Sequence, residues 1–340
     1  MSENEYTTES ITLLRDLEAV RKRPGMYLGD TYERGLQHMI LEVFSNAVDA
    51  ALKVDKPTVS IHSLYPEVVI EDNGGGMPFE FNMEEGKTAT ELYLTRLHFS
   101  GTADKHAPHV HLGYNWGVGL AVVNAVSSLL DVKSWSKGKR WHTAYRQGEQ
   151  KIPLEIIGEG EGRGTIISFA PDPEIFENVV INEQNLRSVI FQSVHLIPGL
   201  TVNFLIETFH SKNGLSDLLP VMTPWVRISY DKSFCFNEQI DDFHLNVCLS
   251  GNGDKLKNMN WVSWVNGGLT VQHGSHVKAV RKALKKTSWT AKSGLVHILH
   301  YNPCFAGPTR GKLELPGIEK RITEILIPRI EEHLKERDVM

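Results

Sequence analysis

Residues 36–52 (LQHMILEVFSNAVDAAL) limit the folds open to this chain more than any other stretch. At about 100° per residue, apolar side chains cover one broad side of a helix, namely Ile40, Val43, Phe44, Ala47, Val48 and Ala51. Glu42, Asn46 and Asp49 lie at i, i+4 and i+7 and form a polar stripe on the other side. On an isolated helix such a stripe is a solvated face, so its meaning depends on the segments around it.

Two glycine-rich segments follow this helix, EDNGGGMP at 71–78 and LGYNWGVG at 112–119. Asp72 ends an expected strand, and Gly74 and Gly76 behind it let the backbone approach a ligand closely. The second segment precedes an apolar helix, where backbone N–H groups bind phosphate. The structural alternatives are an ordinary Asp-Asn-Gly turn and an ordinary helix entry.

Together with RKRPGMYLGDT at 21–31, these segments resemble the ATPase region of DNA gyrase B and topoisomerase IV B subunits, which are Bergerat-fold (GHKL) ATPases. The resemblance implies an α+β fold, with a Bergerat α/β sandwich (a mixed sheet with helices on one face) followed by a smaller α/β transducer domain. We expect the ATPase domain in 1–219, with an N-terminal arm in 1–10. The transducer-like domain is expected in 220–340, ending before the family's usual long C-terminal helix.

The resemblance also implies a site for ATP and Mg²⁺. Glu42 matches the general base, Asn46 matches the Mg²⁺ ligand, and Asp72 with Thr165 matches the adenine-recognising pair. The other nucleotide-binding positions are Asp49, Gly74, Gly76, Met77, Pro78, Gly113, Tyr114, Asn115, Trp116, Gly117, Val118 and Gly119. Tyr6, in the arm, is a candidate for contacting the nucleotide of a partner subunit, and a disordered terminus is its structural alternative.

A second part of the site is expected in 302–316 (NPCFAGPTRGKLELP), which resembles the family's loop with a lysine that senses the γ-phosphate. Here the triplet is Pro308-Thr309-Arg310, so we assign the catalytic cation to Arg310. Its guanidinium binds phosphate bidentately and is not equivalent to a lysine. Lys312 is the second candidate, and a basic surface loop is the structural alternative.

Three departures from the family pattern concern the pocket itself. The family has Glu where this chain has Ala50 and Arg where it has Gly75, and these two form an ion pair beside the nucleotide. Since both are missing, neither charge is left without its partner. Trp116 occupies a position usually held by His. We expect nucleotide binding to survive in a pocket that is more open on this side.

The remaining elements are read from periodicity and turn residues. Helices are expected at 11–20, 91–98, 119–130, 183–196, 275–286 and 318–336, and a mobile loop at 100–111. Strands are expected as a hairpin in 58–72, as an antiparallel set in 130–170, and at 201–207, 243–250, 260–265 and 295–301.

Composition excludes several other classes. The chain is 41% hydrophobic, and no apolar run approaches the about 18 residues of a membrane helix. The polar N-terminus is unlike a signal peptide. Three cysteines without CxxC spacing argue against a disulfide framework or a zinc site, so we expect a cytoplasmic protein.

A net charge of −5 argues against a broad nucleic-acid-binding surface but not against a local basic patch. Five basic residues gather on the expected helix at 275–286, namely Lys278, Arg281, Lys282, Lys285 and Lys286. They are suited to sequence-independent contact with a DNA backbone, and a solvated helix face is the equal alternative.

The sequence therefore predicts an ATP-hydrolysing clamp that forms a homodimer on binding ATP and couples turnover to DNA strand passage. Nothing resembles a DNA-cleavage domain, so this chain alone is not expected to cut DNA, and a separate DNA-cleaving subunit is a candidate partner. The alternative is a stand-alone GHKL dimerisation module with slow ATPase activity and another task. A histidine-kinase or chaperone relative is disfavoured, because RKRPGMY and PTRGKL point to topoisomerases.

Overall fold

The computed structural model describes residues 16–97, 119–177, 180–223, 233–251, 260–307 and 309–338. Its larger sheet contains β1 (Thr58–Ser63), β2 (Val68–Asp72), β5 (Ser127–Ser136), β6 (Lys139–Arg146), β7 (Glu149–Glu159), β8 (Gly164–Pro171), β9 (Thr201–Phe204) and β10 (Glu207–His210). The smaller sheet contains β11 (Phe234–Ile240), β12 (Phe243–Leu249), β13 (Asn260–Val265), β14 (Gly268–Leu269) and β15 (Ser293–His300). A third, two-stranded sheet pairs β3 (Phe81–Asn82) with β4 (Lys87–Thr88).

The helices are α1 (Asp16–Lys22), α2 (Gly25–Leu28), α3 (Glu33–Ala51), α4 (Ala89–Thr95), α5 (Gly119–Ala125), α6 (Glu183–Leu196), α7 (Leu215–Met222), α8 (Ser275–Lys286) and α9 (Ile318–Asp338). No helix in the described ranges is both long and apolar enough to span a bilayer.

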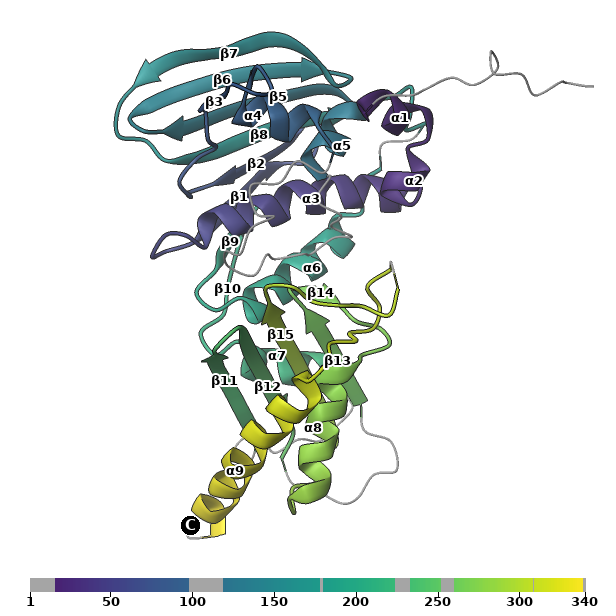
Figure 1. The fold of residues 1–340 in the computed structure, drawn as a ribbon, viewed down its shortest axis with the longest axis vertical. Coiled ribbons are helices and arrows are strands. Elements are labelled where there is room, and N and C mark those ends of the chain that lie inside the picture. The colour runs from purple at the N-terminus through teal and green to yellow at the C-terminus, as the bar shows by residue number, and fades with distance from the viewer. Residues whose placement is uncertain are drawn as a thin grey trace, which may run out of the picture.

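Both main sheets are mixed. The larger one has the strand order β10-β9-β1-β2-β8-β5-β6-β7, in which only β1 and β9 pair in parallel. The smaller one has the order β11-β12-β15-β13-β14, with β13 and β15 parallel. Helices α3, α4 and α5 lie over one face of the larger sheet, whereas α8 and α9 pack together beside the smaller one (Figure 1). The predicted α+β class and the Bergerat sandwich with a second, smaller domain are confirmed.

Helix α3 lies across the larger sheet because its apolar side is buried against β1 and β2. Phe44 and Val48 have no exposed surface, and burying a side chain of this size contributes about 1.5–3 kcal/mol. The helix begins just after Asp30, whose Oδ1 accepts hydrogen bonds from the N–H groups of Tyr32 (3.0 Å) and Gly35 (2.9 Å). A carboxylate here satisfies donors that the first helical turn leaves unpaired.

Two element predictions are wrong. The helix expected over 119–130 ends at Ala125, and β5 begins at Ser127 and continues with the buried Leu130. A short apolar run fits a helix and a buried strand equally, so its periodicity does not separate them. The single strand expected over 201–207 is instead the hairpin of β9 and β10, which turns at Leu205 (φ 54°) and the fully exposed Ile206.

The cysteine spacing argues against a disulfide framework, and the structure contains one disulfide that the sequence did not predict. Cys235 and Cys248 form a disulfide between β11 and β12, where they are direct cross-strand neighbours with Cα atoms 4.3 Å apart. Strand β11 was not predicted, and its register with β12 is what brings the two cysteines together. The spacing of the cysteines in the sequence does not reveal this pairing.

Helix α7 lies between the two sheets. Its Leu215, Leu218 and Leu219 are buried, and they belong to a hydrophobic core that continues to Trp264 and Leu295 of the smaller sheet. The predicted domain boundary, between residues 219 and 220, falls inside this helix. The division of the chain at this point stays a prediction.

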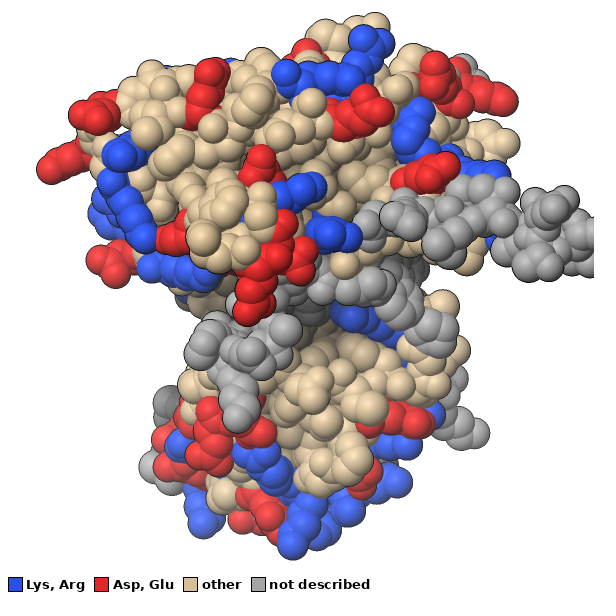
Figure 2. All heavy atoms as spheres, turned by 45° about the horizontal axis from the view of Figure 1, so that its top comes forward, with Lys and Arg blue, Asp and Glu red and all other residues tan. Residues whose placement is uncertain are grey.

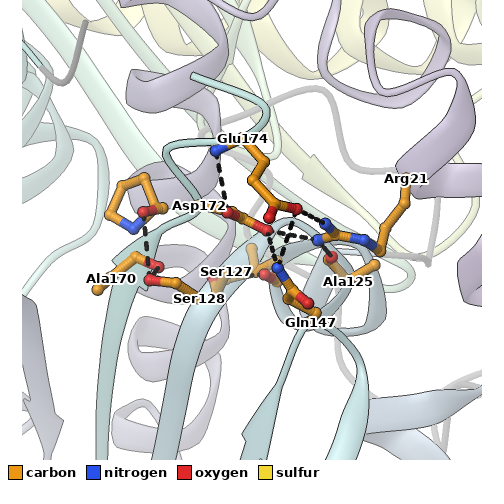
Figure 3. Close-up of polar contacts among 10 residues, drawn as sticks. Arg21, Ala125, Ser127, Ser128, Gln147, Ala170, Asp172 and Glu174 are labelled. Carbon is orange, nitrogen blue, oxygen red and sulfur yellow. Dashed lines mark hydrogen bonds and ion pairs between the residues drawn. The ribbon is translucent and has the colours of Figure 1, made fainter. Parts of the chain in front are cut away.

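A buried ion pair ties α1 to the segment after β8 (Figure 3). The Arg21 Nη1 donates hydrogen bonds to Asp172 Oδ2 (2.7 Å) and to the carbonyl oxygen of Ala125 (2.8 Å). Gln147 Nε2 (2.8 Å) and the N–H of Glu174 (3.1 Å) also donate to this carboxylate. Burial alone raises the pKa of Asp172, but these hydrogen bonds and the charge of Arg21 outweigh burial and hold the pKa below its usual value.

Replacing Arg21 by Met should lower the free energy of unfolding at pH 7 by about 2–4 kcal/mol, because it leaves a buried carboxylate without its cation. Because the pKa of Asp172 is lower in the folded state than in the unfolded state, its carboxylate stabilises the protein above the unfolded pKa, and this stabilisation is lost as the pH falls. The destabilisation caused by Arg21→Met should therefore be smaller in acid. Urea denaturation at pH 7 and pH 3 measures both effects. Lys151→Met, which breaks only an exposed pair with Glu149, is the control, and equal losses in the two variants would contradict the role given to Arg21.

Candidate nucleotide site

Glu42 lies in the middle of α3 and is only 4% exposed. His38, one turn earlier, places its Nε2 2.9 Å from Glu42 Oε1, within hydrogen-bonding distance. Oε2 is buried and has no hydrogen-bond partner within the described ranges. Leaving such an atom unpaired costs about 1–3 kcal/mol. At Glu42 the polar stripe is therefore not a solvated face. One of its carboxylate oxygens is available to bind a ligand or water.

His38 was not among the predicted site residues. The sequence contained a signal for it, because residues at i and i+4 of one helix are neighbours. A histidine on the same stripe, one turn before the proposed base, is therefore close enough to bond to it.

Helix α5 approaches Glu42 through a residue that has no side chain. A β-carbon on Gly119 would lie 2.1 Å from Oε2 of Glu42, which is too close for any packing. The first residue of α5 thus lies directly against the carboxylate. Several predicted site residues lie outside the described ranges and stay predictions, namely Tyr6, Gly113, Tyr114, Asn115, Trp116, Gly117 and Val118.

Asn46 follows Glu42 on the same stripe and is half-buried, as is Asp49 one turn further on. The amide Nδ2 of Asn46 donates to the carbonyl oxygen of Glu42 at 2.7 Å, while its amide oxygen accepts no hydrogen bond from the described residues. No group of three or more His, Cys, Asp or Glu side chains in the described part of the chain can hold a metal ion. A single amide oxygen fits a Mg²⁺ ion whose other ligands are phosphate and water oxygens.

Asp72 marks the other end of the site. It ends β2 and is 6% exposed, and its Oδ1 accepts a hydrogen bond from the N–H of Gly74 at 2.8 Å. Burial raises the pKa of Asp72 to about 7, although hydrogen bonds from the backbones of Gly74 and Thr165 oppose the shift. Near neutral pH this carboxyl group is therefore close to the midpoint of its titration.

Ser134 of β5, which was not predicted, joins the loop after β2 to β8. Its Oγ accepts a hydrogen bond from the N–H of Met77 (2.9 Å) and donates to the carbonyl oxygen of Gly164 (3.1 Å). It also lies 2.9 Å from Thr165 Oγ1, so the predicted Thr165 is part of a buried polar cluster. The alternation of β5 was the available signal for Ser134, since every second residue of a strand points to the same face.

The loop at 73–78 is held from both sides. A β-carbon on Gly74 would lie 2.4 Å from the carbonyl oxygen of Ala50 on α3, and Gly76 adopts a φ of 79°, which favours glycine. The carbonyl oxygen of Pro78 accepts a hydrogen bond from Thr90 Oγ1 of α4 at 2.7 Å. Ala50 follows Glu42 by about 12 Å along α3. The loop and the buried carboxylate thus lie beside two points of α3 that are about 12 Å apart.

Arg310 brings the smaller-sheet part of the molecule to the same helix. Burial lowers the pKa of Arg310 and the negative charge of Glu42 opposes that shift, so the two groups lie within electrostatic reach. Lys312, the second candidate, is paired instead with Glu314. Pro308 lies outside the described ranges.

Comparisons with known proteins agree with this arrangement. Residues 31–175 match the family described as "Histidine kinase-, DNA gyrase B-, and HSP90-like ATPase". The B subunit of DNA gyrase from Thermotoga maritima is 30% identical over 357 residues, covering 94% of this chain and 56% of that protein. The B subunit of the type 2 topoisomerase from Aquifex aeolicus is 30% identical over 367 residues, covering 99% of this chain and 46% of that protein.

Solved structures give the same result. The 43K ATPase domain of Thermus thermophilus gyrase B, in complex with an aminocoumarin, has a TM-score of 0.76 and 27% identity and covers 96% of this chain and 91% of that one. The topoisomerase IV ATP-binding domain of Francisella tularensis, in complex with a small-molecule inhibitor, has a TM-score of 0.73 and 25% identity and covers 94% and 93%.

In residues 31–175 the chain matches the family of histidine kinase-, DNA gyrase B- and HSP90-like ATPases. Within them it is a relative of the ATPase and transducer region of gyrase B and topoisomerase IV B subunits, along nearly its whole length. It spans about half the length of the curated relatives that it matches, between 46% and 57% in eight of them.

Replacing Asp72 by Asn should change how stability depends on pH. Because the pKa of Asp72 is about 7 in the folded protein against a usual 3.8, the folded state keeps a proton that the unfolded state releases between these values. The stability due to Asp72 is therefore present below about pH 4 and lost as the pH rises to about 7. Across this interval the wild-type protein should lose on the order of 4 kcal/mol relative to the Asn variant.

Urea denaturation at several pH values from 4 to 8 measures this difference, and the exposed Asp55→Asn is the matched control. A difference between wild type and Asp72→Asn that stays constant with pH, or that grows in favour of the wild type as pH rises, would contradict the buried, protonated state of Asp72.

Proposed function

We propose that this chain is the ATP-binding and ATP-hydrolysing clamp of a type IIA DNA topoisomerase B subunit of gyrase B or topoisomerase IV type, acting in the cytoplasm. The observation that carries the proposal is the buried Glu42, which His38 holds through one oxygen while the other has no partner in the described ranges. Hydrolysis of a γ-phosphate needs a group that orients the attacking water and takes its proton. Oε2 of Glu42 is suited to that role.

The other residues of this end have matching roles. The hydrogen bond between His38 Nε2 and Oε1 fixes the carboxylate of Glu42 in one orientation, and Arg310 offers a guanidinium that pairs with phosphate oxygens. The amide oxygen of Asn46 would hold Mg²⁺. When bound, this ion supplies positive charge to the phosphate oxygens. The close approach of Gly119 excludes bulk water from Oε2 on one side.

At the opposite end, Asp72 and Thr165 would bind the adenine base. The carboxyl group of Asp72 can accept a hydrogen bond from the exocyclic amine of adenine, and Ser134 fixes both Thr165 and the loop that closes over the base. A β-carbon on Gly75 would meet no atom within 4 Å, so the pocket is open where the family has an arginine. Ala50 likewise offers no charge there.

The resemblance to gyrase B subunits supports a task for the clamp. ATP would join two copies of the chain, and hydrolysis would separate them and so drive DNA strand passage when a DNA-cleaving part is present. The division into an ATPase part and a transducer part at α7 belongs to this proposal.

Contact with DNA would be independent of sequence and would use α8, whose basic residues include Arg281 stacked over Trp261 at 5.2 Å. Acidic and basic side chains are mixed over the larger-sheet part, and several basic side chains gather at the far end of the smaller-sheet part (Figure 2). This distribution supports a local contact with phosphates rather than a coating of nucleic acid.

Glu42→Gln is the variant that tests the proposal. It keeps the size of the side chain and an oxygen for His38 but removes the base, so kcat for ATP should fall by about 10²–10⁴-fold. The KM for ATP should change by less than about threefold, because other residues of the proposed site bind the nucleotide. Steady-state phosphate release measures both constants, with Glu33→Gln on the exposed first turn of α3 as the matched control.

The same variant separates the two candidate functions. With its ATP uncleaved, Glu42→Gln should accumulate as a dimer in Mg²⁺ and ATP, which light scattering after size exclusion detects. Unchanged turnover in Glu42→Gln would remove the base assignment. Slow turnover in the wild type together with intact ATP-dependent dimerisation would favour the alternative, a stand-alone dimerisation module whose altered cation and missing ion pair slow hydrolysis.

A further inference from the structure

A cavity of about 370 Å³ lies between α3 and the smaller-sheet part of the molecule. Its walls are the N-terminal half of α3, the β13–β14 hairpin with the residues after it, and the loop at 305–311. The cavity adjoins the catalytic end of the nucleotide site, with which it shares His38 and Arg310, and it extends away from the adenine end, because none of Asn46, Asp72, Ser134 and Thr165 lines it. Its volume lies within the roughly 300–1,000 Å³ typical of small-molecule sites.

The cavity is positively charged. Arg34 and Arg310 contribute guanidinium groups, and no Asp or Glu is among the described residues that line it. Arg34 is 81% exposed, and its Nε lies 4.0 Å from Oδ2 of Asp30, whose Oδ1 already accepts two backbone hydrogen bonds. An exposed pair at this distance is weak. The Arg34 guanidinium therefore keeps donors for a second anion.

The cavity is also apolar. Leu269 and Val271 line it with 53% and 71% of their surface exposed, which is unusual for aliphatic side chains that share one concave wall. Phe305 also lines it, with the guanidinium of Arg310 5.6 Å from the centre of its ring. The cavity thus offers a cationic end and an apolar body to one occupant.

We propose that this cavity is a second ligand site, which binds a small organic anion that carries a carboxylate on an apolar ring. The carboxylate would pair with Arg34 or Arg310, because a guanidinium matches the two oxygens of a carboxylate. The ring would cover Leu269 and Val271 and remove their apolar surface from water.

The site would also regulate ATP turnover, an effect that rests on the proposed function. His38 lines the cavity and holds Glu42, and Arg310 lies within electrostatic reach of Glu42, so both groups belong to the cavity and to the catalytic end. An anion that engages Arg310 withdraws this cation from the γ-phosphate. The occupant therefore lowers kcat for ATP and leaves the recognition of adenine, at the far end of α3, unchanged.

The probe for this site is 4-bromobenzoate, whose bromine atom is located by anomalous scattering in soaked crystals and whose affinity is measured by calorimetry in solution. We expect a bromine peak between α3 and Phe305. Arg34→Gln should weaken binding by about threefold to fivefold, and Arg146→Gln, an exposed arginine on β6 outside the cavity, should leave it unchanged. Val271→Asp, which places a negative charge on the apolar wall, should abolish binding.

The second site would be overturned by a bromine peak only beside Asp72, by no peak at all, or by a peak without measurable binding in solution. Equal affinities of the wild type and Arg34→Gln for the probe would also overturn it. Binding in the cavity with no fall in kcat for ATP would overturn the regulatory role. A protein that binds the probe in the cavity but does not bind ATP would instead contradict the proposed function and leave the site itself standing.

Discussion

The structure depends on a carboxylate that a helix holds out of water. One side of α3 forms the core of the larger sheet through Phe44 and Val48, and this packing fixes the position of the helix. On its other side the first residue of α5 lies against Glu42, which is buried although it belongs to a polar stripe. His38 satisfies one carboxylate oxygen, and the burial of the second is a cost that folding alone does not explain.

The same helix relates the two ends of the site. Its last turn lies directly against the loop at 73–78, where Gly74 approaches Ala50, and its middle carries Glu42, about 12 Å away along the helix. This is the order of separation between the base and the terminal phosphate of a nucleoside triphosphate. A rigid helix thereby fixes the distance between base recognition and the proposed chemistry. The smaller-sheet part adds Arg310 within electrostatic reach of Glu42, which is the end where we propose that the terminal phosphate binds.

Much of this arrangement could be predicted because its motifs are local. The spacing of Glu42 and Asn46 predicts that they share one face of a helix, and the glycines after Asp72 predict a loop there. Ser134 and the cavity beside Arg310 were missed because they depend on which strands become neighbours, which period alone does not give. The Cys235–Cys248 pair was missed for the same reason, since it needs the register of a strand that was itself not predicted. The segment at 119–130 was misread because a buried strand and a buried helix both appear as a continuous apolar run.

The most direct measurement is the crystal structure of the protein with Mg²⁺ and a non-hydrolysable ATP analogue. We expect the adenine at Asp72 and Thr165, the metal ion on the amide oxygen of Asn46, and the terminal phosphate between Oε2 of Glu42 and the guanidinium of Arg310. An analogue bound elsewhere, or bound with its terminal phosphate directed away from Glu42, would contradict the assignment of this helix as the centre of the site.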